Sequence, residues 1–296
     1  MTVPFHIAEA AKAADIETVR EWLATNDVND VWDGIDPIFQ PNSPLPRTLL
    51  LCVVDPHGAS ITAAHVDLAR LLLARGADVN KRMDHWTALH YACRGYGGDN
   101  CVAMVSLLIE AGADVNFTRT GGYLFSRKTP LSVAIGNLKG RALPNESDEA
   151  RRFTCRQVVT LLLASGASLD VTSYSWESHE LALPHDHLRD VLNGIRQSHT
   201  GPRAVEETEG FEHVLACRDL IAGVRAAGSW RSFLDGPRKQ LLVWRSLALR
   251  GCARPERWIV KSPTCRAMEF LTFAPNEIAW NILKYWRTAH DDIVGV

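Results

Sequence analysis

The chain has 296 residues, 46% of them hydrophobic, and a formal net charge of −2. This length accommodates one extended array and a small second domain, and the composition is typical of a globular protein rather than a disordered or fibrous one. Charge is unevenly spread, because residues 1–40 hold eight acids and residues 225–266 hold ten bases. This polarity either steers a charged partner or reflects two solvated helix faces, and we favour the second interpretation.

Several features of the sequence indicate the cellular compartment in which the protein is expected. The longest apolar run, Leu49 to Val54, is far shorter than the roughly 20 residues that a membrane helix needs, so we expect no membrane segment. The N-terminal residues mix acids and a lysine with apolar positions, so we expect no secretion signal. The seven cysteines are irregularly spaced, which favours reduced, mostly buried thiols. We therefore expect an intracellular protein, cytoplasmic or nuclear.

Two short helices are expected near the N-terminus, at Ile7 to Ala14 and at Ile16 to Leu23. Their charged positions would supply the polar outer face of a capping unit. A segment with four prolines, Asp33 to Arg47, follows. We expect this insertion to be disordered or simply tolerated.

A five-residue motif recurs in the middle of the chain. Gly76 to Asn80 (GADVN) returns as Gly112 to Asn116, and in weaker form as Gly166 to Asp170 (GASLD). The three copies follow expected helices at Val66–Arg75, Val102–Glu110 and Val158–Ala164. A second signature, which begins with threonine, occurs at Thr48–Val53 (degenerate), Thr87–Ala92 and Thr129–Ala134.

Both signatures hold the residues that helix ends require. A threonine before a helix accepts a backbone N–H at the N-cap, and Pro130 follows its threonine where no N–H is needed. A glycine after the second helix suits the left-handed conformation that ends many helices. A unit of two short helices cannot bury its apolar faces alone, so successive units must stack.

Together the signatures resemble the ankyrin-repeat family, whose repeat of about 33 residues has a β-turn and two antiparallel helices. The resemblance implies an all-α solenoid with β-hairpin connections over residues 1–197. We count four repeats and a degenerate fifth at Ser178 to Gln197. The resemblance also implies that His90 hydrogen-bonds within and between turns and is structural.

Two further insertions depart from the family pattern. Thr118 to Lys128 lengthens a hairpin connection and mixes aromatic residues with arginines, and binding and disorder are both open for it. Gly140 to Arg152 is polar and lies between two expected helices. We expect it to be disordered or simply tolerated.

The pattern changes after Gln197. Residues 198–202 are expected to form a turn or linker. Helices are expected at Glu206 to Ala227, at 238–250 and from Pro275 onwards. Residues 203–296 therefore form either a small helical domain or a cap on the open end of the array.

This C-terminal segment has two weak resemblances. Pro275 to Trp286 is similar to the opening of an F-box, a family that continues for further helices. The segment is also similar to the SOCS box, with Arg245 where that family has a cysteine. Either resemblance implies that residues 238–288 recruit a cullin-type ubiquitin ligase. We favour the alternative that these helices cap the array.

Motifs for catalysis are missing from the sequence. The chain has no phosphate-binding loop, nucleophile elbow or dinucleotide fingerprint, so we expect neither an enzyme nor a cofactor. Gly95 to Gly98 is better explained as a flexible turn than as a phosphate cradle. Three histidines gather near Asp186 without a neighbouring cysteine, so we expect no metal site there. These histidines are His179, His185 and His187.

Tryptophans stand among arginines in the basic C-terminal region, where they could stack on nucleic-acid bases. These are Trp230, Trp244 and Trp258. Because Trp244 lies on an apolar helix face, we expect it in the core and do not expect nucleic acid as a partner.

We therefore expect a scaffold or adaptor that binds another protein across a concave face and its hairpin fingers. Tryptophan, tyrosine and arginine are enriched where binding energy is concentrated. The predicted contact residues are Lys81, Arg82, Met83, Asp84, Trp86, Tyr91, Arg94, Phe117, Arg119, Tyr123 and Phe125. The alternative for the aromatic members is packing between repeats. The second functional hypothesis is a substrate-recognition subunit of a ubiquitin ligase.

Overall fold

A computed structural model of the chain describes residues 2–32, 47–56, 60–82, 86–94, 96, 98–118, 128–139, 147–174, 180–198 and 209–236. The chain divides into two compact units, residues 1–221 and 222–296. The described helices are α1 (Phe5–Lys12), α2 (Ile16–Trp22), α3 (Leu49–Val54), α4 (Ala63–Ala74), α5 (Ala88–Ala92), α6 (Asp99–Glu110), α7 (Pro130–Asn137), α8 (Asp148–Ala164), α9 (Pro184–Ser198) and α10 (Phe211–Ala227). The described strands form two antiparallel hairpins, β1 (Val31–Trp32) with β2 (Arg47–Thr48) and β3 (Ser173–Tyr174) with β4 (Leu181–Ala182).

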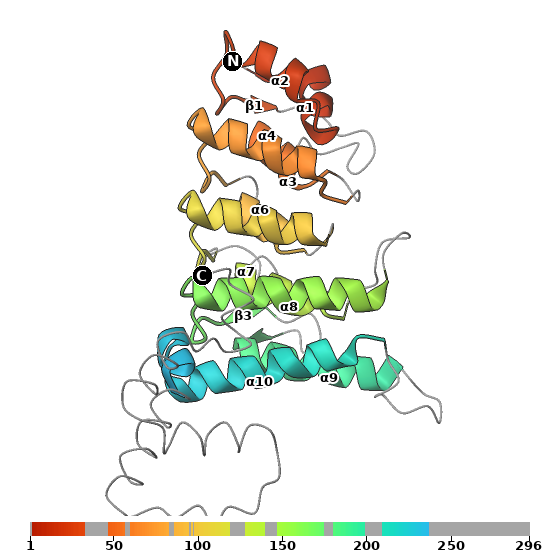
Figure 1. Ribbon diagram of the computed structural model, residues 1–296, viewed down its shortest axis with the longest axis vertical. Helices are drawn as coiled ribbons and strands as arrows, with labels where there is room; N and C mark the ends of the chain where they lie inside the picture. Colours follow the sequence, from red (N-terminus) through yellow and green to blue (C-terminus); the bar gives the residue numbers. More distant parts are fainter. Residues whose placement is uncertain are drawn as a thin grey trace, which may run out of the picture. The chain divides into compact units, whose positions relative to one another are not determined.

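The first unit consists of helix pairs stacked along the chain (Figure 1). Helices α1, α3, α5, α7 and α9 form one row in which each helix packs on the next, and we call it the first row. Helices α4, α6 and α8 form the second row, and each packs on the first-row helix that precedes it. The start of α10 lies against α8, since a Cβ added to Gly210 would stand 2.8 Å from the Cα of Glu149.

Threonines begin three first-row helices, as the second signature predicts. Thr48 Oγ1 accepts from the N–H of Leu51 at the start of α3, and Thr129 Oγ1 accepts from the N–H of Ser132 at the start of α7. Thr87 takes the same N-cap position before α5. Each cap satisfies a backbone donor that the helix itself leaves unpaired.

Glycines end the second-row helices, also as expected. Gly76, Gly112 and Gly166 have φ values of +87°, +87° and +88°, which is the left-handed region that favours glycine. The chain then turns into the next repeat.

Asparagine amides join the turns of successive repeats. Asn29, Asn80 and Asn116 each donate from Nδ2 to the carbonyl of the glycine in the next turn, at 3.0 Å. Each also accepts at Oδ1 from the backbone N–H two residues beyond that glycine, at 2.7 to 2.8 Å. Asp170 stands at the equivalent place in the following turn and has no amide N–H to continue the series.

Aliphatic side chains from both rows fill the interior. Leu49, Leu68, Leu89 and Leu108 are fully buried, as the stacking of amphipathic pairs requires. The described cysteines confirm the expected free, buried thiols. These are Cys52, Cys93, Cys101, Cys155 and Cys217.

One expectation about the insertions is wrong. Residues 148–152 are not part of a disordered loop, because α8 begins at Asp148. Ser147 caps this helix by accepting a hydrogen bond from the N–H of Ala150. Two acidic side chains in the first turn interact favourably with the helix dipole. The rest of that insertion, residues 140–146, lies outside the described residues, as do 33–46 and 119–127.

The β3–β4 hairpin and α9 lie in and beside the segment expected to form a degenerate fifth repeat. The expected helix at Glu206 to Ala227 is observed as α10 from Phe211. The other expected helices, at 238–250 and from Pro275, lie outside the described residues, and so do both weak resemblances. The division into residues 1–197 and 203–296 stays a prediction.

Candidate protein-binding surface

The predicted contact residues divide into those that are described and those that are not. Lys81 and Arg82 are exposed just after the turn that follows α4, as expected for a hairpin tip. Partly buried members are Trp86, Tyr91, Arg94 and Phe117. The others lie outside the described residues: Met83, Asp84, Arg119, Tyr123 and Phe125.

Three of the predicted aromatic residues gather around the buried ring of His90. Trp86 meets Tyr91 edge to face, with ring centroids 5.2 Å apart. The centroid of His90 lies 5.9 Å from that of Trp86 and 5.7 Å from that of Phe117. The guanidinium of Arg82 lies 5.6 Å from the centroid of Phe117. We call Arg82, Trp86, Tyr91 and Phe117 the aromatic cluster.

His90 serves as the support of this cluster. Its Nδ1 accepts from the backbone N–H of Thr87 at 3.3 Å, and Nε2 donates to the carbonyl of Lys128 at 3.2 Å. Burial lowers the pKa of His90 to about 4, so the ring is neutral near pH 7. This geometry agrees with a structural role within and between turns.

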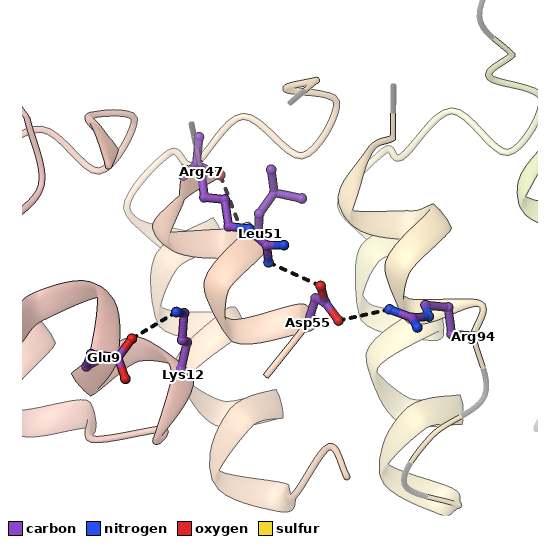
Figure 2. A network of polar contacts seen from close by, with 7 residues as sticks. Glu9, Lys12, Arg47, Leu51, Asp55 and Arg94 are labelled. Carbon is purple, nitrogen blue, oxygen red and sulfur yellow. Dashed lines mark hydrogen bonds and ion pairs between the residues drawn. The ribbon is translucent and has the colours of Figure 1, made fainter. Parts of the chain in front are cut away.

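A second group of side chains surrounds Asp55 and Arg94, which follow the C-terminal ends of α3 and α5 (Figure 2). The carboxylate of Asp55 accepts from Nη1 of Arg47 at 3.1 Å and from Nη1 of Arg94 at 3.2 Å. Arg94 also lies over the Tyr96 ring, at 5.3 Å. Arg151 of α8 approaches the same ring, with its guanidinium carbon 5.0 Å from the centroid. We call Arg47, Asp55, Arg94, Tyr96 and Arg151 the arginine cluster.

Arg151 is almost completely buried, with 2% of its surface exposed. Its Nη2 donates to Oδ1 of Asn137 at 3.2 Å. Nε and Nη1 have no hydrogen-bond partner among the described residues. A guanidinium keeps its charge inside a protein, so burial does not remove it.

The two clusters adjoin each other. Arg47 pairs with Asp55 and also lies over the Tyr91 ring, 5.7 Å from its centroid. The surface therefore draws on several consecutive repeats, through the ends of α3 and α5, the tip after α4 and the start of α8. Sequence patterns place Arg47 and Arg151 in insertions and Tyr96 in a glycine turn, so they predict only Arg94 of the arginine cluster.

The histidines near Asp186 have other contacts. Nε2 of His187 is 2.7 Å from the hydroxyl of the buried Ser173. Nε2 of His185 lies 3.5 Å from a carboxylate oxygen of Asp186. His179 lies outside the described residues. Nothing in this arrangement brings the described histidines to a common point.

Elsewhere, ligand atoms of Glu149, Glu212 and His213 lie within 4.8 Å of one another. The two carboxylates are exposed. Burial lowers the pKa of His213, the negative charges of Glu212 and Glu149 oppose this shift, and the positive charges of Arg156 and Arg152 add to it. Exposed acidic groups commonly lie together without an ion, so we assign no metal to this group.

Comparisons with known proteins agree with the architecture. The family model described as ankyrin repeats matches residues 7–119 and 56–143, in three copies. Residues 7–143 of the chain are ankyrin repeats. Among solved structures, it is 19% identical to the human ASB11 ankyrin repeat domain (TM-score 0.32) and 20% identical to the ankyrin repeat protein EF0377 (TM-score 0.30). Each match covers 71% of this chain and 96% of the other. No curated protein sequence matches it.

The predicted fold class is therefore confirmed: helix pairs with short strand hairpins form an ankyrin solenoid. Ankyrin repeats form a protein–protein interaction domain, and the fold itself supplies no catalytic group. No helix in the described ranges is long and apolar enough to cross a membrane.

Proposed function

We propose that this ankyrin-repeat protein is an adaptor that binds another protein across the aromatic cluster and the arginine cluster. The gathering of Trp86, Tyr91 and Phe117 into one partly exposed group supports this proposal most directly. Large rigid aromatic side chains and arginines beside them supply much of the energy at protein interfaces. We propose binding, and not catalysis, as the activity of this surface.

The aromatic side chains are also part of the packing between repeats. His90 holds Trp86 and Phe117 in place, and its own position depends on Thr87 and Lys128. A surface fixed in this way loses little conformational entropy when a partner binds. The two interpretations of these residues, packing and binding, are therefore compatible.

Site-specific photo-crosslinking of the full chain tests the proposal. An Arg82→p-benzoylphenylalanine variant carries the reactive group on the exposed hairpin tip. The matched control, Arg70→p-benzoylphenylalanine, carries it on the exposed face of α4 in the second row. In extracts of cells that express the chain, we expect a discrete partner adduct from the variant at position 82 only. The same adducts from both positions would contradict the proposed surface.

A second candidate is recruitment of a cullin-type ubiquitin ligase through residues 238–288, as the similarity at Pro275 to Trp286 implies. Affinity capture with the full chain tests it by mass spectrometry. If this candidate is correct, cullin-type components appear with the natural chain and are lost from a Trp244→Ala, Trp286→Ala variant that keeps its thermal unfolding transition. Capture without ligase components would leave these helices as a cap.

A further inference from the structure

The arginine cluster holds more positive charge than its own acid balances. Arg47 and Arg94 share the carboxylate of Asp55, and no ion pair of Arg151 is seen among the described residues. The next charged pair along the first row, Lys12 with Glu9 at 2.8 Å, is balanced by itself. The whole chain has a formal charge of −2, so this local excess of cations departs from the average of the molecule.

The position of Arg151 makes the imbalance costly. Its side chain is buried, and two of its nitrogen donors have no partner among the described residues. A buried charge is tolerated when an opposite charge lies close, because water cannot screen it there. Asn137 supplies a neutral oxygen only. The site is therefore more stable when an anion lies nearby.

Arg94 can be reached by an anion from solvent, whereas the buried Arg151 cannot. Its side chain is 37% exposed, and Nη1 is occupied by Asp55. No other hydrogen bond of its guanidinium is seen among the described residues. Arg94 and Arg151 lie against the same Tyr96 ring. An anion that binds Arg94 from solvent would thus also lie near the ring against which the charge of Arg151 packs.

We infer that the partner contributes an acidic segment whose aspartate or glutamate carboxylate binds Arg94 beside Tyr96. This inference rests on the proposed function and adds the chemistry of the partner. A carboxylate matches the planar fork of a guanidinium and accepts two parallel hydrogen bonds from it. The neighbouring aromatic cluster, reached through Arg47 and Tyr91, offers apolar contact area to a peptide. Charge complementarity of this kind sets both partner choice and the rate of association.

Fluorescence anisotropy with the full-length protein tests the inference. The probe is a fluorescein-labelled peptide of eight glutamates, and a labelled oligothymidylate of equal charge serves as a comparison. We expect the glutamate peptide to bind saturably and to bind more tightly than the oligothymidylate. Arg94→Gln should weaken peptide binding at least about tenfold, and Arg94→Lys should weaken it less, because the charge stays and the fork is lost. Arg70→Gln, on an exposed helix face, should leave it unchanged.

Absence of saturable peptide binding would overturn the inference, and so would equal losses in Arg94→Gln and Arg70→Gln. Oligothymidylate binding as tight as that of the peptide would also overturn it, since the site would then be one for any polyanion. Partner adducts from position 82 combined with no glutamate-peptide binding would overturn this inference and leave the proposed function standing. Adducts equally distributed between positions 82 and 70 would instead count against the proposed function.

Discussion

Asp55 and Arg94 occupy the same place in successive ankyrin repeats, and they form an ion pair of 3.2 Å between Oδ1 and Nη1. Each stands seven residues after the threonine that begins its first-row helix, since 55 − 48 and 94 − 87 both equal 7. Stacking brings equivalent positions together, so opposite charges at one repeat position meet across the interface. The pair therefore links two repeats at the edge of the candidate binding surface.

Replacing Asp55 by asparagine should destabilise the fold. The carboxylate is 11% exposed and serves Arg47, which is itself 10% exposed, so its loss would leave a buried guanidinium without an ionic partner. We expect the free energy of unfolding to fall by about 3 kcal/mol, as for other broken buried pairs. Urea unfolding measures this change.

The exposed pair between Asp67 and Arg70 on α4 provides the control. Both side chains are more than half exposed, so Asp67→Asn should change the free energy of unfolding by less than about 0.5 kcal/mol. Equal effects of the two aspartate substitutions would show that burial of Asp55 does not govern its contribution.

The repeat framework is readily predicted because its signals are local. Capping threonines and left-handed glycines act within a few residues of their place in the sequence. The asparagines of the turns bond to the next repeat, but each lies in a recurring turn. The arginine cluster is harder to predict, because Tyr96 comes from an irregular connection and Arg151 from the polar first turn of α8, and the two meet only when successive repeats stack. Asp55 and Arg94 occupy the same position in successive repeats. A comparison of equivalent positions in neighbouring repeats would therefore have predicted their ion pair.

The start of α8 is a second place where the sequence pattern led to a wrong prediction. Polar residues between two helices are typical of a loop, yet Ser147 caps the helix and the acids that follow it lie in the first turn. Capping chemistry was the better guide than polarity at this place. The contact residues at 119–127 stay predictions.

Stability should depend on pH through His90. Burial lowers its folded-state pKa to about 4 from an ordinary value of 6.5, so the unfolded chain binds the proton more readily. Stability is then fully present above pH 6.5, falls as the pH drops towards 4, and changes no further below that through this group. We expect the free energy of unfolding at pH 5 to be about 2 kcal/mol lower than at pH 7. Urea titrations at both pH values measure it.

A His90→Gln variant isolates that contribution. Glutamine at this third helical position can keep the reciprocal bond to Thr87 and does not titrate. The pH dependence between 7 and 5 should shrink by most of the expected difference, whereas His6→Gln, at an exposed residue of α1, should leave it unchanged. A pH profile identical in all three proteins would refute the assignment.

The asparagine series between turns makes a prediction about local opening. Asn80→Ala removes the donor to the Gly112 carbonyl and the acceptor for the N–H of Asp114. We expect the free energy of unfolding to fall by about 1 to 2 kcal/mol, because both hydrogen bonds lie at the surface, where water partly replaces them. Hydrogen exchange should show faster exchange at the Asp114 amide. Asn26→Ala removes a bond within one turn, to the carbonyl of Trp22, and should leave that amide unaffected.

Two glycines should respond to alanine with opposite signs. Gly112 has φ +87°, and an added Cβ would meet nothing within 4 Å, so the whole penalty of Gly112→Ala lies in the backbone. The left-handed conformation costs a non-glycine residue about 1 to 2 kcal/mol. Gly136 lies inside α7, where an added Cβ also meets nothing within 4 Å. Gly136→Ala should therefore stabilise the fold by about 0.5 to 1 kcal/mol, since alanine loses less conformational entropy in a helix. Paired thermal unfolding of the two variants measures the signs. Destabilisation by both would mean that α7 needs its glycine for a reason other than space or backbone conformation.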